Sequence, residues 1–210
     1  MTDKKYCIMD MDGTLIDSMP YWNTLSPDYL VERGITKSTE GLVEILRTMT
    51  MPQACVYLKK EYDLPETSEE ILRQLNQVMR RHYAEDIPLK KNVREHLDML
   101  QEEGAKLCVV TATALPLVHL CLQRLGVEDY FAFIMSCEEV GCGKDRPDAF
   151  LEAARRLGAQ PRDIYVYEDS YTALQTARDA GFKTVGVYDP YSGAWEQCIS
   201  VSDETITDWV

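Results

Sequence analysis

The stretch CIMDMDGTL, residues 7–15, leads an apolar run directly into two aspartates, a glycine and a threonine. Its apolar residues predict a buried strand over KYCIM, residues 5–9. Asp10 and Asp12 then follow the carboxyl end of that strand. Because open α/β sheets bind their ligands at this end, the two aspartates are the first candidates for a functional site.

A second pattern occurs four times in the second half of the chain. A segment with helical periodicity ends on a glycine, and a short β-rich run follows it. The glycines are Gly104, Gly126, Gly158 and Gly181, and the runs after them are KLCVV, YFAFIMS, DIYVY and FKTVGVY. Each glycine suits the left-handed position that ends a helix. Helices that alternate with short apolar strands predict an α/β fold, a doubly wound parallel sheet covered by helices on both faces.

The pattern changes between Leu15 and about Pro88, where no convincing strand occurs. EEILRQLNQVMRRHY, residues 69–83, carries apolar residues at an amphipathic helical spacing, and SPDYLVERG, TEGLVEILRTM and PQACVYLKKEY also read as helices. We therefore expect an all-helical cap domain over residues 16–90, inserted into a catalytic α/β core formed by residues 1–15 and 91–210. The two junctions would act as hinges.

Composition and charge exclude several classes of partner. With 22 basic and 35 acidic side chains the net charge is −13, which argues against nucleic acid and anionic membranes as partners. The longest uncharged stretch, residues 107–123, is interrupted by Thr, Pro and His and is short for a membrane span. The seven cysteines form no C-x-x-C pair, and no export signal is visible. We expect a cytoplasmic protein.

Reactive side chains end or follow four of the predicted strands. They are Asp10 and Asp12, Thr111, Lys144, and the pair Glu168 and Asp169. Each has an ordinary explanation alone, as a helix cap, a β-branched strand residue or a surface lysine. Together, the carboxylates supply the hard oxygen ligands that Mg²⁺ prefers, and a lysine with a hydroxyl can hold phosphoryl oxygens. The set predicts phosphoryl transfer.

In these motifs and their order the chain resembles the haloacid dehalogenase (HAD) superfamily. Its four motifs are D-x-D-G-T, a Ser or Thr that ends a strand, a Lys, and a terminal acidic pair. The resemblance extends over essentially the whole chain, and the helical insertion after the first motif marks the phosphoglycolate phosphatase and β-phosphoglucomutase branch. It implies a Mg²⁺-dependent phosphatase that acts on a small soluble phosphate monoester, and we expect a monomer.

The resemblance also implies a role for each motif residue. Asp10 would be the nucleophile that forms an aspartyl-phosphate, and Asp12 would protonate the leaving oxygen and then activate water. Thr111 and Lys144 would hold the phosphoryl group. The implied Mg²⁺ ligands are Asp10, Asp12 through its backbone carbonyl, Asp169, and Glu168 either directly or through water.

A sugar-phosphate mutase of the β-phosphoglucomutase type is the main alternative, because the EDS at residues 168–170 resembles the mutase form of the last motif. Mutases carry a cap histidine where this chain has Trp22, and usually a Ser where it has Thr111, so hydrolysis is favoured. The cap also offers candidates for substrate selection, although helix packing explains the aromatic residues better and a solvated face explains the cations better. They are Tyr21, Trp22, Arg47, Tyr57, Lys59 and Lys60.

Two non-enzymatic alternatives are weaker. A signalling receiver domain also combines an Asp, an acidic pair, a Thr and a Lys, but its acidic pair comes first in the chain and it has no cap. Here the pair comes last, at residues 168 and 169, and the second aspartate of the first motif is typical of rapid turnover. A catalytically silent binding protein would usually lack at least one of these groups.

Overall fold

The computed structural model describes residues 4–46 and 49–209. The chain divides into two compact units, of which the second is Pro20–Asp86 and the first contains the segments on either side of it. The sequence pattern places the boundaries a few residues away, at 15/16 and 90/91. The difference arises because the two connecting segments pair with each other inside the first unit. The Asp17 amide donates to the Pro88 carbonyl at 3.0 Å, and the Lys90 amide donates to the Leu15 carbonyl at 2.9 Å.

The first unit is built on a six-stranded parallel sheet with the strand order β3-β2-β1-β4-β5-β6. The strands are β1 (Tyr6–Met9), β2 (Lys106–Thr111), β3 (Phe131–Ser136), β4 (Ile164–Glu168), β5 (Lys183–Val187) and β6 (Glu204–Ile206). Strands β1, β2, β4 and β5 are buried along nearly all of their length, as expected for a sheet with helices on both faces. The prediction of a doubly wound parallel α/β fold is confirmed.

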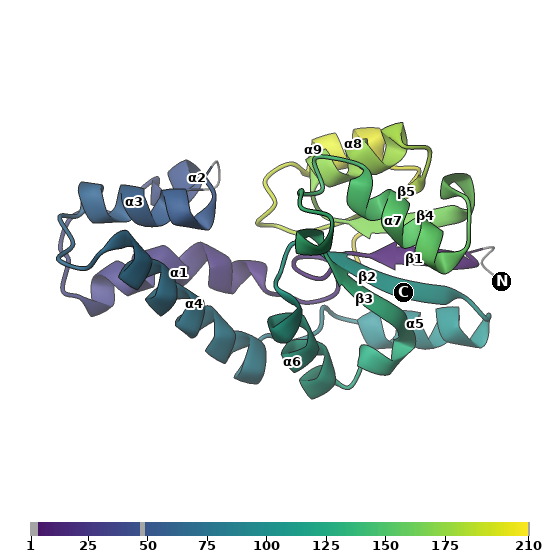
Figure 1. The fold of residues 1–210 in the computed structure, drawn as a ribbon, viewed down its shortest axis with the longest axis horizontal. Coiled ribbons are helices and arrows are strands. Elements are labelled where there is room, and N and C mark those ends of the chain that lie inside the picture. The colour runs from purple at the N-terminus through teal and green to yellow at the C-terminus, as the bar shows by residue number, and fades with distance from the viewer. Residues whose placement is uncertain (1–3, 47–48, 210) are drawn as a thin grey trace. The chain divides into compact units, whose positions relative to one another are not determined.

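The helices of this unit lie on the two faces of the sheet (Figure 1). They are α5 (Val93–Glu102), α6 (Leu115–Leu125), α7 (Asp148–Leu157), α8 (Tyr171–Asp179) and α9 (Trp195–Val201), with the short 3-10 turns η1 (Glu128–Tyr130), η2 (Cys137–Glu139) and η3 (Pro161–Asp163). In Figure 1, α5 and α6 cover one face, and α7, α8 and α9 cover the other. All four glycines predicted to end helices have positive φ angles.

The strand order reverses beside β1, which pairs with β2 on one side and with β4 on the other. The Asp10 amide extends the second pairing by donating to the carbonyl of Tyr167 at 3.0 Å. Ligands of doubly wound folds bind at such a switch point, beyond the carboxyl ends of the strands. The side chains that follow β1 and β4 therefore occupy the position where this architecture places function.

In the second unit, helices are the only regular elements among the described residues, 20–46 and 49–86. Its helices are α1 (Met19–Glu32), α2 (Leu42–Leu46), α3 (Met51–Glu61) and α4 (Ser68–Glu85). Helix α4 begins with a capping box between Thr67 and Glu70, and its buried residues recur every four positions as the sequence predicts. Among the described residues of the whole chain, no helix has both the length and the apolar composition of a membrane span.

Candidate active site

The chain turns sharply as soon as β1 ends. The Met11 carbonyl accepts the amides of Leu15 and Ile16 at 2.9 and 3.0 Å, and the Gly13 amide donates to the Ile16 carbonyl at 3.1 Å. This turn separates Asp10, which stays at the strand end, from Asp12, which lies on the loop.

Gly13 and Thr14 hold the loop after β1 against Asp169, which follows β4. Gly13 has a φ of +79°, and a Cβ atom on it would lie 2.5 Å from Oδ2 of Asp169. The fully buried Thr14 donates its hydroxyl to Oδ1 of Asp169 at 3.1 Å. A side chain at position 13 would be incompatible with both this backbone conformation and the space available. The glycine and threonine of the motif therefore have a defined structural purpose, which is to let the two strand ends meet.

Three carboxylates meet at this point. Asp10, Glu168 and Asp169 each offer an oxygen that lies within 4.8 Å of the other two, and all three residues are buried. Burial and the charge of Glu168 raise the pKa of Asp10 well above its usual range. Burial, Glu168 and Asp189 raise the pKa of Asp169 to about 7. The cluster requires positive charge if its members are to be ionised together.

Lys144 supplies part of that charge. Its ammonium group forms ion pairs with Asp10 and with Oε1 of Glu168, the latter at 2.5 Å. Burial alone would lower the pKa of Lys144, but the two carboxylates outweigh burial and raise it, so the side chain stays protonated. One ammonium group balances one of three carboxylates. The three carboxylates offer only hard oxygen ligands, so the set fits Mg²⁺.

Thr111 and Asp12 are joined through Thr113. Thr111 ends β2 and is buried, and its hydroxyl oxygen accepts the amide of Thr113 at 3.1 Å. The hydroxyl of Thr113 donates to Oδ2 of Asp12 at 2.8 Å. Asp12 therefore points its carboxylate to the end of β2 and does not contribute it to the acidic cluster. The expected role of its backbone carbonyl as a metal ligand stays a prediction.

An additional ion pair lies behind the cluster. The side chain of Asp189, which follows β5, is fully buried, and its Oδ2 lies 2.8 Å from the ammonium group of Lys90. Lys90 also donates to the carbonyl of Tyr188 at 2.8 Å. The pair affects the cluster electrostatically, because Asp189 raises and Lys90 lowers the pKa of Asp169. No local sequence signal identifies this contact, since it joins two loops about 100 residues apart.

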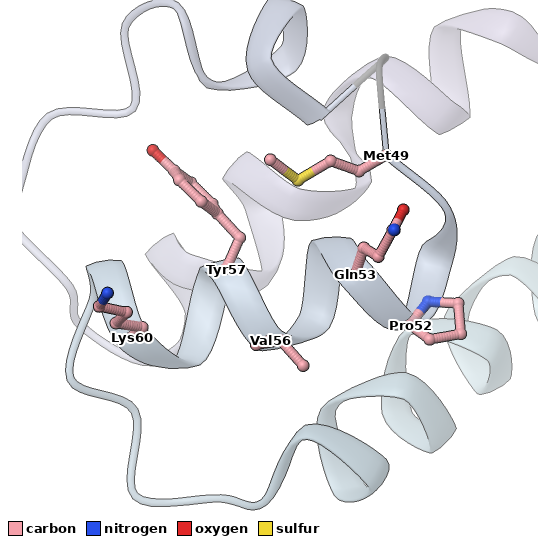
Figure 2. A pocket seen from close by; sticks show the side chains of 6 residues that line it. All are labelled: Met49, Pro52, Gln53, Val56, Tyr57 and Lys60. Atoms are coloured by element: carbon pink, nitrogen blue, oxygen red, sulfur yellow. The ribbon is translucent and has the colours of Figure 1, made fainter.

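The candidates for substrate selection in the helical unit have different surroundings. Lys59 donates to the carbonyls of Leu64 and Glu66, and the ring of Tyr21 lies 4.8 Å from that of His82, so both have structural contacts. Tyr57 and Lys60 lie on an open, mostly apolar pocket along α3 (Figure 2). Its lining residues are Met49, Pro52, Gln53, Val56, Tyr57 and Lys60. Trp22 is half-buried, and Arg47 lies outside the described residues.

The contact between Gly13 and Asp169 predicts that Gly13→Ala weakens Mg²⁺ binding at least tenfold, because the new methyl group must displace a ligand carboxylate. Gly104→Ala is a matched control, since Gly104 has a similar φ of +77° but nothing within 4 Å of the added atom. Isothermal titration calorimetry measures both affinities. Equal Mg²⁺ affinities in the two variants would show that the cluster tolerates the methyl group.

The raised carboxylate pKa values predict that protons compete with the metal. With a pKa of about 7, Asp169 is mostly protonated at pH 6 and mostly ionised at pH 8. Mg²⁺ affinity should therefore rise at least about tenfold between these values, with at least about one proton, that of Asp169, released per ion bound at pH 6. Calorimetry in two buffers of different ionisation enthalpy counts the protons. The same affinity at pH 6 and pH 8 would contradict the prediction.

The same raised pKa values predict how the stability of the metal-free protein changes with pH. A folded-state pKa above the unfolded value means that the native state holds more protons, so the stabilisation is complete below about pH 4. It is lost as the pH rises through about 7, the pKa of Asp169 in the folded protein. Added Mg²⁺ should restore stability at the upper end of this range.

Comparison with known proteins identifies the family of this chain. The model of the family described as haloacid dehalogenase-like hydrolase matches residues 7–187. Among curated proteins, phosphoglycolate phosphatase from Escherichia coli O157:H7 is 28% identical over an alignment of 211 residues that covers 87% of this chain and 81% of the relative.

Solved structures share the fold. A protein assigned as a β-phosphoglucomutase from Thermotoga maritima has a TM-score of 0.84 and 22% identity, and covers 96% of this chain and 94% of its own. A protein predicted to be a phosphoglycolate phosphatase from Haemophilus somnus has a TM-score of 0.81 and 24% identity. It covers 100% of this chain and 96% of its own. The resemblance drawn from the four motifs is confirmed. Because the family model spans most of its length, the chain belongs to the haloacid dehalogenase-like hydrolases.

Proposed function

We propose that this chain is a Mg²⁺-dependent phosphatase that hydrolyses a small phosphate monoester through an aspartyl-phosphate on Asp10. The observation that carries the proposal is the separation of the two aspartates of the first motif. Asp10 lies in the buried acidic cluster beside Lys144, whereas Asp12 points its carboxylate to Thr113. A nucleophile and a proton-transfer group need this division, because one must reach phosphorus and the other the leaving oxygen.

In the first half of the reaction, a carboxylate oxygen of Asp10 attacks phosphorus and the bond to the ester oxygen breaks. Asp12 gives its proton to that oxygen, which leaves as an alcohol. Lys144, which the ion pair already holds beside Asp10, contacts the phosphoryl oxygens together with the hydroxyl of Thr111. Bound Mg²⁺, held by Asp10, Glu168 and Asp169, would offset the negative charge that the phosphoryl group brings to these carboxylates.

In the second half, Asp12 is ionised and accepts a proton from a water molecule. The water oxygen bonds to phosphorus, the bond from phosphorus to Asp10 breaks, and inorganic phosphate leaves. Asp12 is then protonated again, as the next turnover requires. Splitting the hydrolysis in this way replaces one difficult displacement by two in which the same two side chains act in sequence.

The curated relatives suggest the first substrate to test. Relatives described as phosphoglycolate phosphatase match at 27 to 28% identity, so phosphoglycolate heads a panel of organic-acid and sugar phosphates. The proposal includes a monomeric, cytoplasmic enzyme, supported by a net charge of −13 and by seven cysteines that form no disulfide. A sugar-phosphate mutase is the alternative outcome and would transfer the phosphoryl group within a sugar bisphosphate instead of releasing it.

The proposal predicts that Asp10→Asn lowers kcat for phosphate release at least a thousandfold, because the amide cannot act as the nucleophile. Chelation of divalent metal by EDTA should abolish release by the wild-type protein, and added Mg²⁺ should restore it. A phosphate-release assay over the substrate panel measures both effects. Asp163→Asn is the matched control, since Asp163 is exposed and precedes β4 at the opposite end of that strand.

Substantial phosphate release by Asp10→Asn would rule out the assigned nucleophile. Release that is insensitive to EDTA would rule out the metal. If the wild-type protein releases no phosphate but converts a sugar bisphosphate, the mutase alternative holds.

A further inference from the structure

Thr113 donates a hydrogen bond to the carboxylate of Asp12, and none of the four motifs assigns it a role. It lies between the end of β2 and the start of α6 at Leu115, and it is half-buried. Its amide donates to the hydroxyl oxygen of Thr111 at 3.1 Å, and its own hydroxyl donates to Oδ2 of Asp12 at 2.8 Å. The residue is therefore fixed at its backbone by one site residue and directs its hydroxyl to another.

Helix capping does not account for this geometry. The N-cap residue of α6, just before Leu115, is Ala114, and no side chain caps the helix there. The hydroxyl of Thr113 instead spans about 100 residues of sequence to reach the loop after β1. A hydrogen bond to a carboxylate is stronger than one between neutral groups, and it restricts the rotation of an aspartate that lies on a loop. The contact therefore acts on the orientation of Asp12.

We propose that Thr113 is a positioning residue that holds the carboxylate of Asp12 for proton transfer to the leaving oxygen. This inference rests on the proposed function, in which Asp12 is the general acid. The geometry supports it in a second way, because Thr111 accepts the amide of Thr113. One tripeptide, residues 111–113, then fixes both the hydroxyl assigned to the phosphoryl group and the carboxylate assigned to the leaving oxygen. Proton transfer requires such a fixed relation between donor and acceptor.

The inference predicts an effect that depends on the leaving group. A poor leaving group, such as the alkoxide of an alkyl phosphate, needs a proton as the bond to phosphorus breaks, whereas 2,4-dinitrophenolate leaves without one. Loss of the Thr113 hydroxyl should therefore slow cleavage of the alkyl ester and spare that of the activated aryl ester. A purely structural role would reduce both rates by the same factor.

The experiment measures kcat/KM for the best alkyl phosphate of the panel and for 2,4-dinitrophenyl phosphate. This ratio reports steps up to the first irreversible one, cleavage of the ester, and is independent of the later hydrolysis of the aspartyl-phosphate. The proteins compared are wild type, Thr113→Val, Thr113→Ala and Thr113→Ser. Thr176→Val is the matched control, since the hydroxyl of Thr176 bonds only to the Thr172 carbonyl within its own helix, α8. Thermal unfolding of each variant confirms that it is folded.

We expect Thr113→Val and Thr113→Ala to lose about tenfold or more in kcat/KM on the alkyl phosphate and less than about threefold on the aryl phosphate. Thr113→Ser, which keeps the hydroxyl, should stay within about threefold of wild type on both. Asp12→Asn should show the same selectivity with a larger loss.

Equal losses on the two substrates, no loss on either, or failure of the serine variant to preserve activity would overturn the role of Thr113. If the wild-type protein hydrolyses neither ester, the proposed function fails and this inference fails with it. If the wild type hydrolyses both and only the predicted selectivity is missing, the proposed function stands and the inference alone is wrong.

Discussion

The mutual repulsion of three buried carboxylates is the constraint on which the rest of the site depends. Asp10, Glu168 and Asp169 lie within 4.8 Å of one another at the ends of β1 and β4, where water cannot screen their charges. Such a cluster destabilises the fold unless positive charge balances it. Lys144 is placed between two of the three, and the remaining charge is what makes the site suited to a divalent cation.

The close approach of the two strand ends follows from small features of the first motif. Gly13 gives the loop its left-handed turn and leaves room for the carboxylate of Asp169, and Thr14 donates to that carboxylate. The turn also sends Asp12 to the end of β2, away from the cluster. Two aspartates that are separated by one residue thus meet different neighbours, and this difference allows them different chemistry.

Much of this could be predicted from the sequence, and the reasons are local. Helix-ending glycines and apolar strands determine the sheet, and parallel strands bring the residues at their carboxyl ends to one edge. The cluster of Asp10, Glu168 and Asp169 could therefore be anticipated from the sequence alone. The start of α1 was harder to predict, because SPD at residues 26–28 resembles a helix start. In the structure Pro27 lies inside a helix that begins at Met19.

The contacts that the sequence did not indicate join loops that are far apart in the chain. Thr113 reaches Asp12, and Lys90 pairs with Asp189 behind the cluster. Threonine and lysine are common in loops, and nothing in their immediate neighbours tells a contact within the site from exposure to solvent. Only the three-dimensional arrangement of the strand ends identifies these partners. The same limit applies to Tyr57 and Lys60, whose shared pocket along α3 depends on how the helix turns (Figure 2).

Whether Asp10 carries the phosphoryl group can be tested with Asp12→Asn and 2,4-dinitrophenyl phosphate. This substrate needs no acid for the first step, whereas hydrolysis of the intermediate needs the missing base, so the intermediate should accumulate. Acid quenching, digestion and mass spectrometry locate the phosphoryl group. We expect about one phosphoryl group per chain, on Asp10. Release of dinitrophenol while Asp10 stays unmodified would contradict it.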